Sequence, residues 1–159
     1  MRFNLISSAD QEGGASGEID EQARVLLSPK RIAFAGVSRS GVSAANSILP
    51  KLRDSGHDVF PVNLIATELE GMDCHPDIPS IPGRVDGVVT VTTPQVTEQI
   101  VRQCAAKGVR RLRIHRALGS CHYDKSIELC KQNGIDVIAG GCPMMFQEPV
   151  DIGHRCMKL

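Results

Sequence analysis

The sequence predicts an α/β protein built on a doubly wound, mostly parallel sheet of five strands with helices on both faces. Two observations support this fold class. Short apolar runs of strand length alternate along the chain with longer stretches whose apolar residues recur at helical spacing. In addition, a glycine-containing turn joins one apolar run to the helical stretch that follows it, as expected where helices connect neighbouring parallel strands.

The predicted elements follow one another in a regular order. The polar residues 1–18 are expected to form a flexible leader, residues 19–146 a single domain and residues 147–159 a tail. Strands are expected at residues 32–35, 58–62, 87–92, 112–115 and 135–139. Helices are expected at residues 19–27, 43–56, 64–71, 94–108 and 123–133. Pro61 lacks a backbone N–H, so we expect it at the end of its strand.

The composition excludes several classes of protein. The chain carries 18 basic and 18 acidic side chains, so it has no overall field that would hold nucleic acid or an anionic membrane. Its apolar runs fall short of a membrane span, and its first residues lack the apolar segment of a signal peptide. We therefore expect a cytoplasmic protein. Its six cysteines are scattered without a CxxC pair, which in that compartment indicates free thiols.

The turn after the strand expected at residues 32–35 has the composition of a phosphate-binding loop. Its residues are Gly36, Val37, Ser38, Arg39, Ser40 and Gly41. Glycines let the backbone approach a ligand closely, and the N–H groups and positive dipole end of the following helix attract anionic oxygens. Compared with the dinucleotide fingerprint GxGxxG, Ser38 replaces the middle glycine. Similar turns also occur where nothing binds, so the pattern alone does not identify a ligand.

The residue after the second of these strands narrows the choice of ligand. NAD enzymes usually place Asp or Glu there, where the carboxylate holds the hydroxyls of the adenine ribose. This chain has the neutral Asn63, and Arg39 lies inside the phosphate turn, so a ribose with an extra phosphate is tolerated. The two residues favour NADP or coenzyme A. Alternatively, Asn63 caps the following helix and Arg39 is a solvated surface charge.

Several segments together resemble the coenzyme A-binding domain family. Between residues 21 and 146 they are, in order, SPKRIAFAGVS, GHDVFPVN, ELEGMDCHPDIPSIP, VDGVVTVTTP and GGCPMM. The family consists of small single-domain proteins similar to the nucleotide-binding domain of the succinyl-CoA synthetase alpha subunit. The resemblance implies a Rossmann-like fold able to bind coenzyme A, with the turn at residues 36–41 at the diphosphate and Asn63 near the adenosine.

Further candidate contacts lie where the remaining strands end, because ligands of open parallel sheets bind outside the carboxyl ends of the strands. These candidates are Thr92, Thr93, Pro94, His115 and Cys142. A histidine at a strand end is a candidate acid or base near neutral pH, but no carboxylate is evidently placed to orient His115, which favours a polar loop residue over a catalytic base. Cys142 follows a glycine pair and is expected either to meet the thiol of bound coenzyme A or to be a buried structural cysteine.

Two other patterns bear on metals and partners. Histidines and cysteines occur as adjacent pairs, as in Cys74-His75, and this spacing does not favour a metal site. Alternation along the strand expected at residues 112–115 places Arg111, Arg113 and His115 on one face of the sheet. We expect that face to be open to solvent, to cover acidic groups of a partner subunit or to reach a ligand phosphate.

These observations predict a small protein that binds coenzyme A or an acyl-CoA and has no catalytic activity of its own. If the protein is an enzyme, the alternative is an NADP-dependent oxidoreductase, although 159 residues leave no room for a substrate domain beside the cofactor sheet. A third alternative is a protein-interaction module that has kept the fold without its ligand. We expect the protein to act as a homo-oligomer or together with a partner enzyme.

Overall fold

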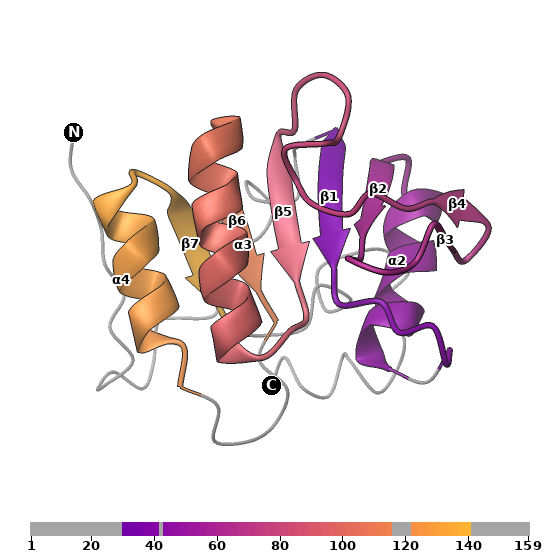
Figure 1. Ribbon diagram of the computed structural model, residues 1–159, viewed down its shortest axis with the longest axis horizontal. Helices are drawn as coiled ribbons and strands as arrows, with labels where there is room; N and C mark the ends of the chain where they lie inside the picture. The colour runs from indigo at the N-terminus through magenta and orange to yellow at the C-terminus, as the bar shows by residue number, and fades with distance from the viewer. Residues whose placement is uncertain (1–29, 42, 116–121, 141–159) are drawn as a thin grey trace, which may run out of the picture.

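The centre of the protein is a five-stranded parallel sheet, seen from one face in Figure 1. The computed structural model describes residues 30–41, 43–115 and 122–140. The strands are β1 (Arg31–Ala35), β2 (Asp58–Val62), β5 (Gly87–Thr90), β6 (Arg111–Ile114) and β7 (Asp136–Ala139). Their order is β2-β1-β5-β6-β7, and all neighbouring pairs are parallel. The order reverses between β1 and β5, so the sheet is doubly wound, as the sequence predicts.

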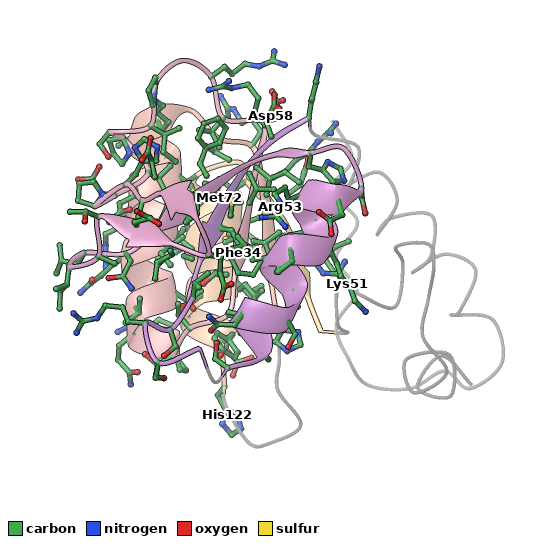
Figure 2. All side chains as sticks on the ribbon, turned by 90° about the vertical axis from the view of Figure 1, so that its right-hand side faces the viewer. Phe34, Lys51, Arg53, Asp58, Met72 and His122 are labelled. Atoms are coloured by element: carbon green, nitrogen blue, oxygen red, sulfur yellow. The ribbon has the colours of Figure 1, made fainter. Side chains whose placement is uncertain are left out.

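Helices cover both faces of this sheet. The helices are α2 (Ala44–Asp54), α3 (Pro94–Lys107) and α4 (Asp124–Gln132). α3 and α4 lie in front of the strands in Figure 1, and α2 lies behind them. Alternate residues of a strand point to opposite faces: in β1, Ile32 and Phe34 belong to the core under α2, whereas Ala33 and Ala35 belong to the core under α3 and α4. Figure 2 shows Phe34 between the sheet and α2.

β2 forms an edge of the sheet, and this position accommodates Pro61. Pro61 lies inside the strand, opposite Phe34 of β1, so its missing N–H falls on the outer side. That outer side is covered by His75, whose N–H donates to the Pro61 carbonyl and whose carbonyl accepts from the N–H of Asn63, each at 2.9 Å. A parallel bridge between Val62 and His75 completes the contact.

Residues 64–71 do not form the helix that the sequence predicts. They contain β3 (Glu68–Leu69), which pairs with β4 (Met72–Asp73) in an antiparallel hairpin. Glu70 and Gly71 form its two-residue turn and have φ values of +52° and +73°, the positive values that tight hairpin turns require. Positive φ is incompatible with a right-handed helix. The hairpin also buries Leu69, which is 5% exposed, in the core under α2.

On the face of β6 that carries Arg111, Arg113 and His115, only Arg111 is partly exposed, so the interpretation of a face open to solvent is wrong for Arg113 and His115. Arg113 is 1% exposed and His115 9%. The Arg113 guanidinium donates to the carbonyl of Gly140, just beyond β7, at 3.5 Å. Arginine tolerates such burial because its stem packs as apolar surface while carbonyl oxygens accept from its head.

Several predicted segments lie outside the described residues. They are the leader at 1–18, the helix at 19–27 and the tail at 147–159. In the part of the chain that the structure describes, none of the helices has both the length and the apolar character needed to cross a membrane.

Candidate functional site

The candidate site lies at the edge of the sheet where the parallel strands end, the lower edge in Figure 1. Gly36 follows β1, Asn63 follows β2, Thr92 lies just beyond β5, His115 follows β6 and Gly140 follows β7. The structure therefore brings sequence-predicted candidates from separate segments to one edge. β1 leads into α2 on one face and β5 leads into α3 on the other. In doubly wound sheets this divergence creates the crevice where ligands bind.

Gly36 is required by the close approach of two strands. Its φ is +114°, and a Cβ at this position would lie 2.2 Å from the carbonyl oxygen of Val91. The two segments are held together because the Val91 N–H donates to the Ala35 carbonyl at 2.9 Å. From the sequence, this glycine is expected where a ligand approaches the backbone. The structure supplies a second reason, since a side chain here would collide with backbone.

The loop after Gly36 is a hydrogen-bonded turn that carries two hydroxyl groups and a cation. The N–H of Gly41 donates to the Ser38 carbonyl at 3.3 Å and closes the turn. The hydroxyls of Ser38 and Ser40 lie 2.7 Å apart, and the Ser40 N–H donates to Ser38 Oγ at 3.2 Å. Arg39 and Ser40 are exposed, and Ser38 is half-buried. These groups suit the recognition of phosphate oxygens at the start of α2.

Asn46, which the sequence analysis did not single out, holds this turn on α2. Its Oδ1 accepts from the Ser38 N–H at 3.1 Å, and its Nδ2 donates to the Ser38 carbonyl at 3.0 Å. Nδ2 also donates to Glu70 Oε1 at 2.7 Å, which connects the turn to the β3–β4 hairpin. Because Asn46 uses the Ser38 N–H, that donor is not available to a ligand.

The N-terminus of α2 is capped by Ser43. Its hydroxyl accepts from the Asn46 N–H at 3.3 Å and donates to Asn46 Oδ1 at 2.6 Å. This differs from a capping box, in which a Glu or Gln three residues after the cap accepts from the backbone N–H of the cap. The spacing of Ser43 and Asn46 was therefore only a partial signal in the sequence for the role of Asn46.

Asn63 ties the end of β2 to the glycine turn. Its Oδ1 accepts from the N–H groups of Ile65 and Ala66, at 3.0 and 3.1 Å, and its Nδ2 donates to the Val37 carbonyl at 3.3 Å. The capping alternative in the sequence analysis thus applies to a turn and not to a helix. A carboxylate at position 63 has no donor for the Val37 carbonyl, so the fold itself favours Asn over Asp. Val37 is 2% exposed and packs in the core.

Threonine hydroxyls form a chain at the end of β5. Thr92 Oγ1 lies 2.7 Å from Thr90 Oγ1 and 2.8 Å from Thr97 Oγ1. Thr90 and Thr97 are fully buried, whereas Thr92 is half-buried. The Tyr123 hydroxyl donates to the Thr92 carbonyl at 2.7 Å. Thr92 is therefore fixed from both α3 and the chain before α4.

A second helix begins at the same edge. Thr93 is the N-cap of α3 and makes no side-chain capping bond, and Pro94 is the first helical residue. Thr93 is exposed. Helix N-termini each carry a partial positive charge of about half an elementary charge. With α2 starting at Ala44, two such N-termini open on this edge and favour an anionic ligand.

His115 and Cys142 complete the predicted set. The His115 N–H donates to the Thr90 carbonyl at 2.9 Å, so His115 continues the pairing of β6 with β5 and is part of the sheet end rather than a loop. Cys142 lies outside the described residues. Among residues 30–41, 43–115 and 122–140, no group of three His, Cys, Asp or Glu side chains is placed to hold a metal ion.

Comparison with known sequences identifies relatives. Residues 30–148 match the family described as CoA binding domain. An ADP-forming acetate–CoA ligase of Methanocaldococcus jannaschii is 24% identical over 145 residues, covering 88% of this chain and 21% of the ligase. The alpha subunit of the ADP-forming acetate–CoA ligase II of Pyrococcus furiosus is 25% identical over 125 residues, covering 74% of this chain and 27% of the subunit. The chain thus matches only 21% and 27% of the length of these two relatives.

Comparison with solved structures also identifies a similar protein. A hypothetical protein from Pyrococcus horikoshii OT3 is similar with a TM-score of 0.77 and 26% identity, covering 89% of this chain and 99% of that one. This likeness confirms the Rossmann-like α/β fold. The family match favours coenzyme A over NADP, the other ligand that the sequence left open. Because the match includes every described strand of the parallel sheet, the chain belongs to the CoA-binding domain family.

Proposed function

We propose that the protein binds coenzyme A or an acyl-CoA at the edge where its parallel strands end, with the diphosphate over the turn at residues 36–41. The observation that carries this proposal is the match to the CoA binding domain family over residues 30–148, a range that contains the turn and the ends of all five strands. The two helix N-termini on this edge support an anionic ligand.

The phosphate contacts in this proposal come from side chains and from the start of α2. The Ser38 N–H is used by Asn46, so the hydroxyls of Ser38 and Ser40 take its place as donors to phosphate oxygens. The exposed Arg39 adds a positive charge between them. Hydrogen bonds to a charged group typically contribute about 1.5–3 kcal/mol, so the loss of one hydroxyl is measurable.

The order of strands matches the order of parts in the ligand. Along the sheet the ends occur as β2, β1, β5, β6, and neighbouring strands lie about 4.8 Å apart. With the diphosphate at the end of β1, the adenosine lies near Asn63 at the end of β2. Leu64 and Ile65, which are 83% and 70% exposed, supply apolar surface there for the adenine ring. The pantetheine arm runs the other way, past Thr92, Thr93 and Pro94 toward His115, with Cys142 proposed to meet its thiol.

The proposal assigns binding to this chain and catalysis to a partner enzyme. The named relatives are acetate–CoA ligases, and this chain corresponds to 21% of one and 27% of the other. We infer that the acyl-group chemistry occurs outside this coenzyme A-binding domain, with a partner enzyme as the expected site. A homo-oligomer remains the alternative assembly.

Isothermal titration calorimetry tests the proposal with coenzyme A, acetyl-CoA, NADP and NAD as ligands. We expect coenzyme A to bind and the two nicotinamide cofactors to bind weakly or not at all. Ser38→Ala should weaken coenzyme A binding by about 1–3 kcal/mol, or roughly 5- to 150-fold, because a charge-assisted hydrogen bond is lost. Ser47→Ala is the matched control, since Ser47 is exposed on α2.

Unchanged affinity in Ser38→Ala would remove Ser38 from the site. Tight binding of NADP or NAD without coenzyme A would overturn the choice of ligand. Mass spectrometry of small molecules released from the purified protein adds a second readout, in which a pantetheine species is expected. If no cofactor is released and none binds, the chain is the interaction module that the sequence left as an alternative.

A further inference from the structure

A cleft of about 510 Å³ lies at the opposite edge of the sheet, where β1, β5 and β6 begin. Its polar lining consists of Lys30, Arg84, Asp86, Arg110 and Arg111. The edge is the upper one in Figure 1, away from the proposed coenzyme site. We propose that this cleft is a second binding site, for a compact polyphosphate anion of the kind represented by inorganic triphosphate.

The charge of the lining supports an anionic ligand. Four cationic side chains and one carboxylate give a net charge of +3, in a protein whose total charge is zero. Arg111 has a further interaction in the structure, and without it the lining still carries +2. Such a local excess attracts anions even when the whole molecule is neutral.

Asp86 offsets only one of these positive charges, because its carboxylate is already paired with Arg84 and the Arg31 N–H. Its Oδ1 lies 2.6 Å from Arg84 Nε, and its Oδ2 accepts from the Arg31 N–H at 3.0 Å. Partial burial raises the pKa of Asp86, but the Arg31 N–H and the charge of Arg84 outweigh this, and the net effect lowers the pKa. The carboxylate is thus ionised, and both of its oxygens already have partners, Arg84 and the Arg31 N–H. Lys30 and Arg110 are exposed and supply the remaining charge.

The wall of the cleft that carries Arg84 is held in place from two sides. From β1, Arg31 donates through Nε to the Arg84 carbonyl at 2.7 Å and through its terminal nitrogen to the Pro82 carbonyl at 2.5 Å. From the end of α3, Lys107 donates to the carbonyl of Ile81 at 2.6 Å. A wall that is already ordered costs less conformational entropy when a ligand binds.

The end of α3 opposes an anion here, but only weakly. Gly108 lines the cleft and is the C-cap of that helix, whose dipole places about half a negative charge at this end. Two of its last carbonyls, those of Ala105 and Cys104, accept from the N–H groups of Gly108 and Val109. Half a charge leaves the cleft positive. The negative end of the helix dipole explains the presence of about one nearby cation. It does not explain Lys30 and Arg84, which come from other segments.

The size and shape of the cleft favour a compact anion over an acidic protein surface. Its volume falls in the range of about 300–1,000 Å³ that small-ligand sites occupy. A protein partner needs an interface of about 800 Å² on each side, much larger than one cleft. Arginine side chains also match the geometry of phosphate oxygens through paired N–H donors.

Backbone amide NMR spectra recorded during titration with sodium triphosphate, at constant ionic strength, test this proposal. We expect shifts at Val85, Asp86 and Gly108, with little change at Gly36 and Gly41. The variant Lys30→Gln/Arg110→Gln removes two charges and leaves the Arg84–Asp86 pair intact, so the protein should stay folded and its dissociation constant should rise at least tenfold. Arg102→Ala is the matched control, since Arg102 is an exposed cation on α3, and its affinity should be unchanged.

Three results would overturn the proposal: shifts confined to residues 36–41, an equal response to sodium chloride at the same ionic strength, or equal affinity in the double variant. No binding of triphosphate at all would also overturn it and leave an acidic partner surface as the interpretation of the cleft. The outcome is independent of the coenzyme proposal, because saturating coenzyme A should leave triphosphate binding at the opposite edge unchanged.

Discussion

Gly36 and Gly41 both have positive φ, +114° and +72°, but their surroundings differ. A Cβ at Gly36 would overlap the backbone of Val91, whereas a Cβ at Gly41 would meet nothing within 4 Å. The first glycine is therefore required by packing as well as by conformation, and the second by conformation alone. Substitutions at the two positions therefore separate the free-energy cost of an unfavourable φ from the cost of atomic overlap within one loop.

Gly36→Ala should lower the free energy of unfolding by about 3 kcal/mol or more, since an unfavourable φ adds to overlap with a neighbouring strand. Gly41→Ala is the control and should cost about 1–2 kcal/mol, the price of a left-handed residue alone. Urea unfolding followed by far-ultraviolet circular dichroism measures both. Equal losses would show that the strand pair relaxes around the added methyl group.

Asn46→Ala should separate the glycine turn from α2. The turn loses two hydrogen bonds to the Ser38 backbone, so we expect a loss of about 1–2 kcal/mol in stability and, in the proposed site, at least roughly tenfold weaker coenzyme A binding. Asn133→Ala is the control, because Asn133 donates to the Leu129 carbonyl at the far end of α4. It should lower stability without changing affinity. If both variants bind coenzyme A equally well, Asn46 does not position the site.

At the scale of elements, α3 and α4 each bring one buried thiol, Cys104 and Cys130, into the core that they share. Cys104 and Cys130 are fully buried, and burial raises the pKa of both, that of Cys130 to about 12. The nearby Cys130 raises the pKa of Cys104 further. Cys74 is half-buried beside β4, where burial also raises its pKa. The reactivity of Cys104 and Cys130 therefore reports whether the packing of α3 against α4 is intact.

These pKa shifts predict a loss of stability at high pH. The folded state keeps the two thiols protonated while the unfolded state ionises them near pH 9, so the free energy of unfolding should fall as pH rises from about 9 to 12. Cys104→Ala/Cys130→Ala should reduce the dependence of the free energy of unfolding on pH.

In timed iodoacetamide labelling at pH 8, Cys74 should react before Cys104 and Cys130, and we expect Cys142 also to precede them. Early labelling of Cys104 would contradict the burial.

The sequence predicted most elements because their patterns are local. Apolar runs and glycine or proline boundaries indicated the five parallel strands and helices α2, α3 and α4. The hairpin was missed because Glu-Gly is a weaker turn signal than Asn-Gly or Asp-Gly, and because Leu64, Ile65 and Leu69 have helical spacing. In the structure the first two are exposed and only Leu69 is buried, which no local pattern distinguishes.

At the scale of the whole molecule, the parallel sheet determines which parts of the candidate site can be located from the sequence. The rule that ligands bind at carboxyl strand ends indicated which segments meet at the candidate site. It gave no hydrogen bonds, so the role of Asn46 and the bond from Asn63 to the Val37 carbonyl were found only in the structure. The basic cleft was missed for a related reason. Lys30, Arg84 and Arg110 are far apart in the chain, and a net charge of zero concealed their gathering at one edge.

The cover on β2 has a consequence for how the sheet can grow. An uncovered edge strand offers its backbone groups to any extended chain, and this is a common route to aggregation. Beyond Phe60 the outer edge of β2 offers no such row, because Pro61 has no N–H and His75 already occupies the Pro61 carbonyl and the Asn63 N–H. A second copy of the protein therefore cannot extend the sheet by adding a strand to this part of β2.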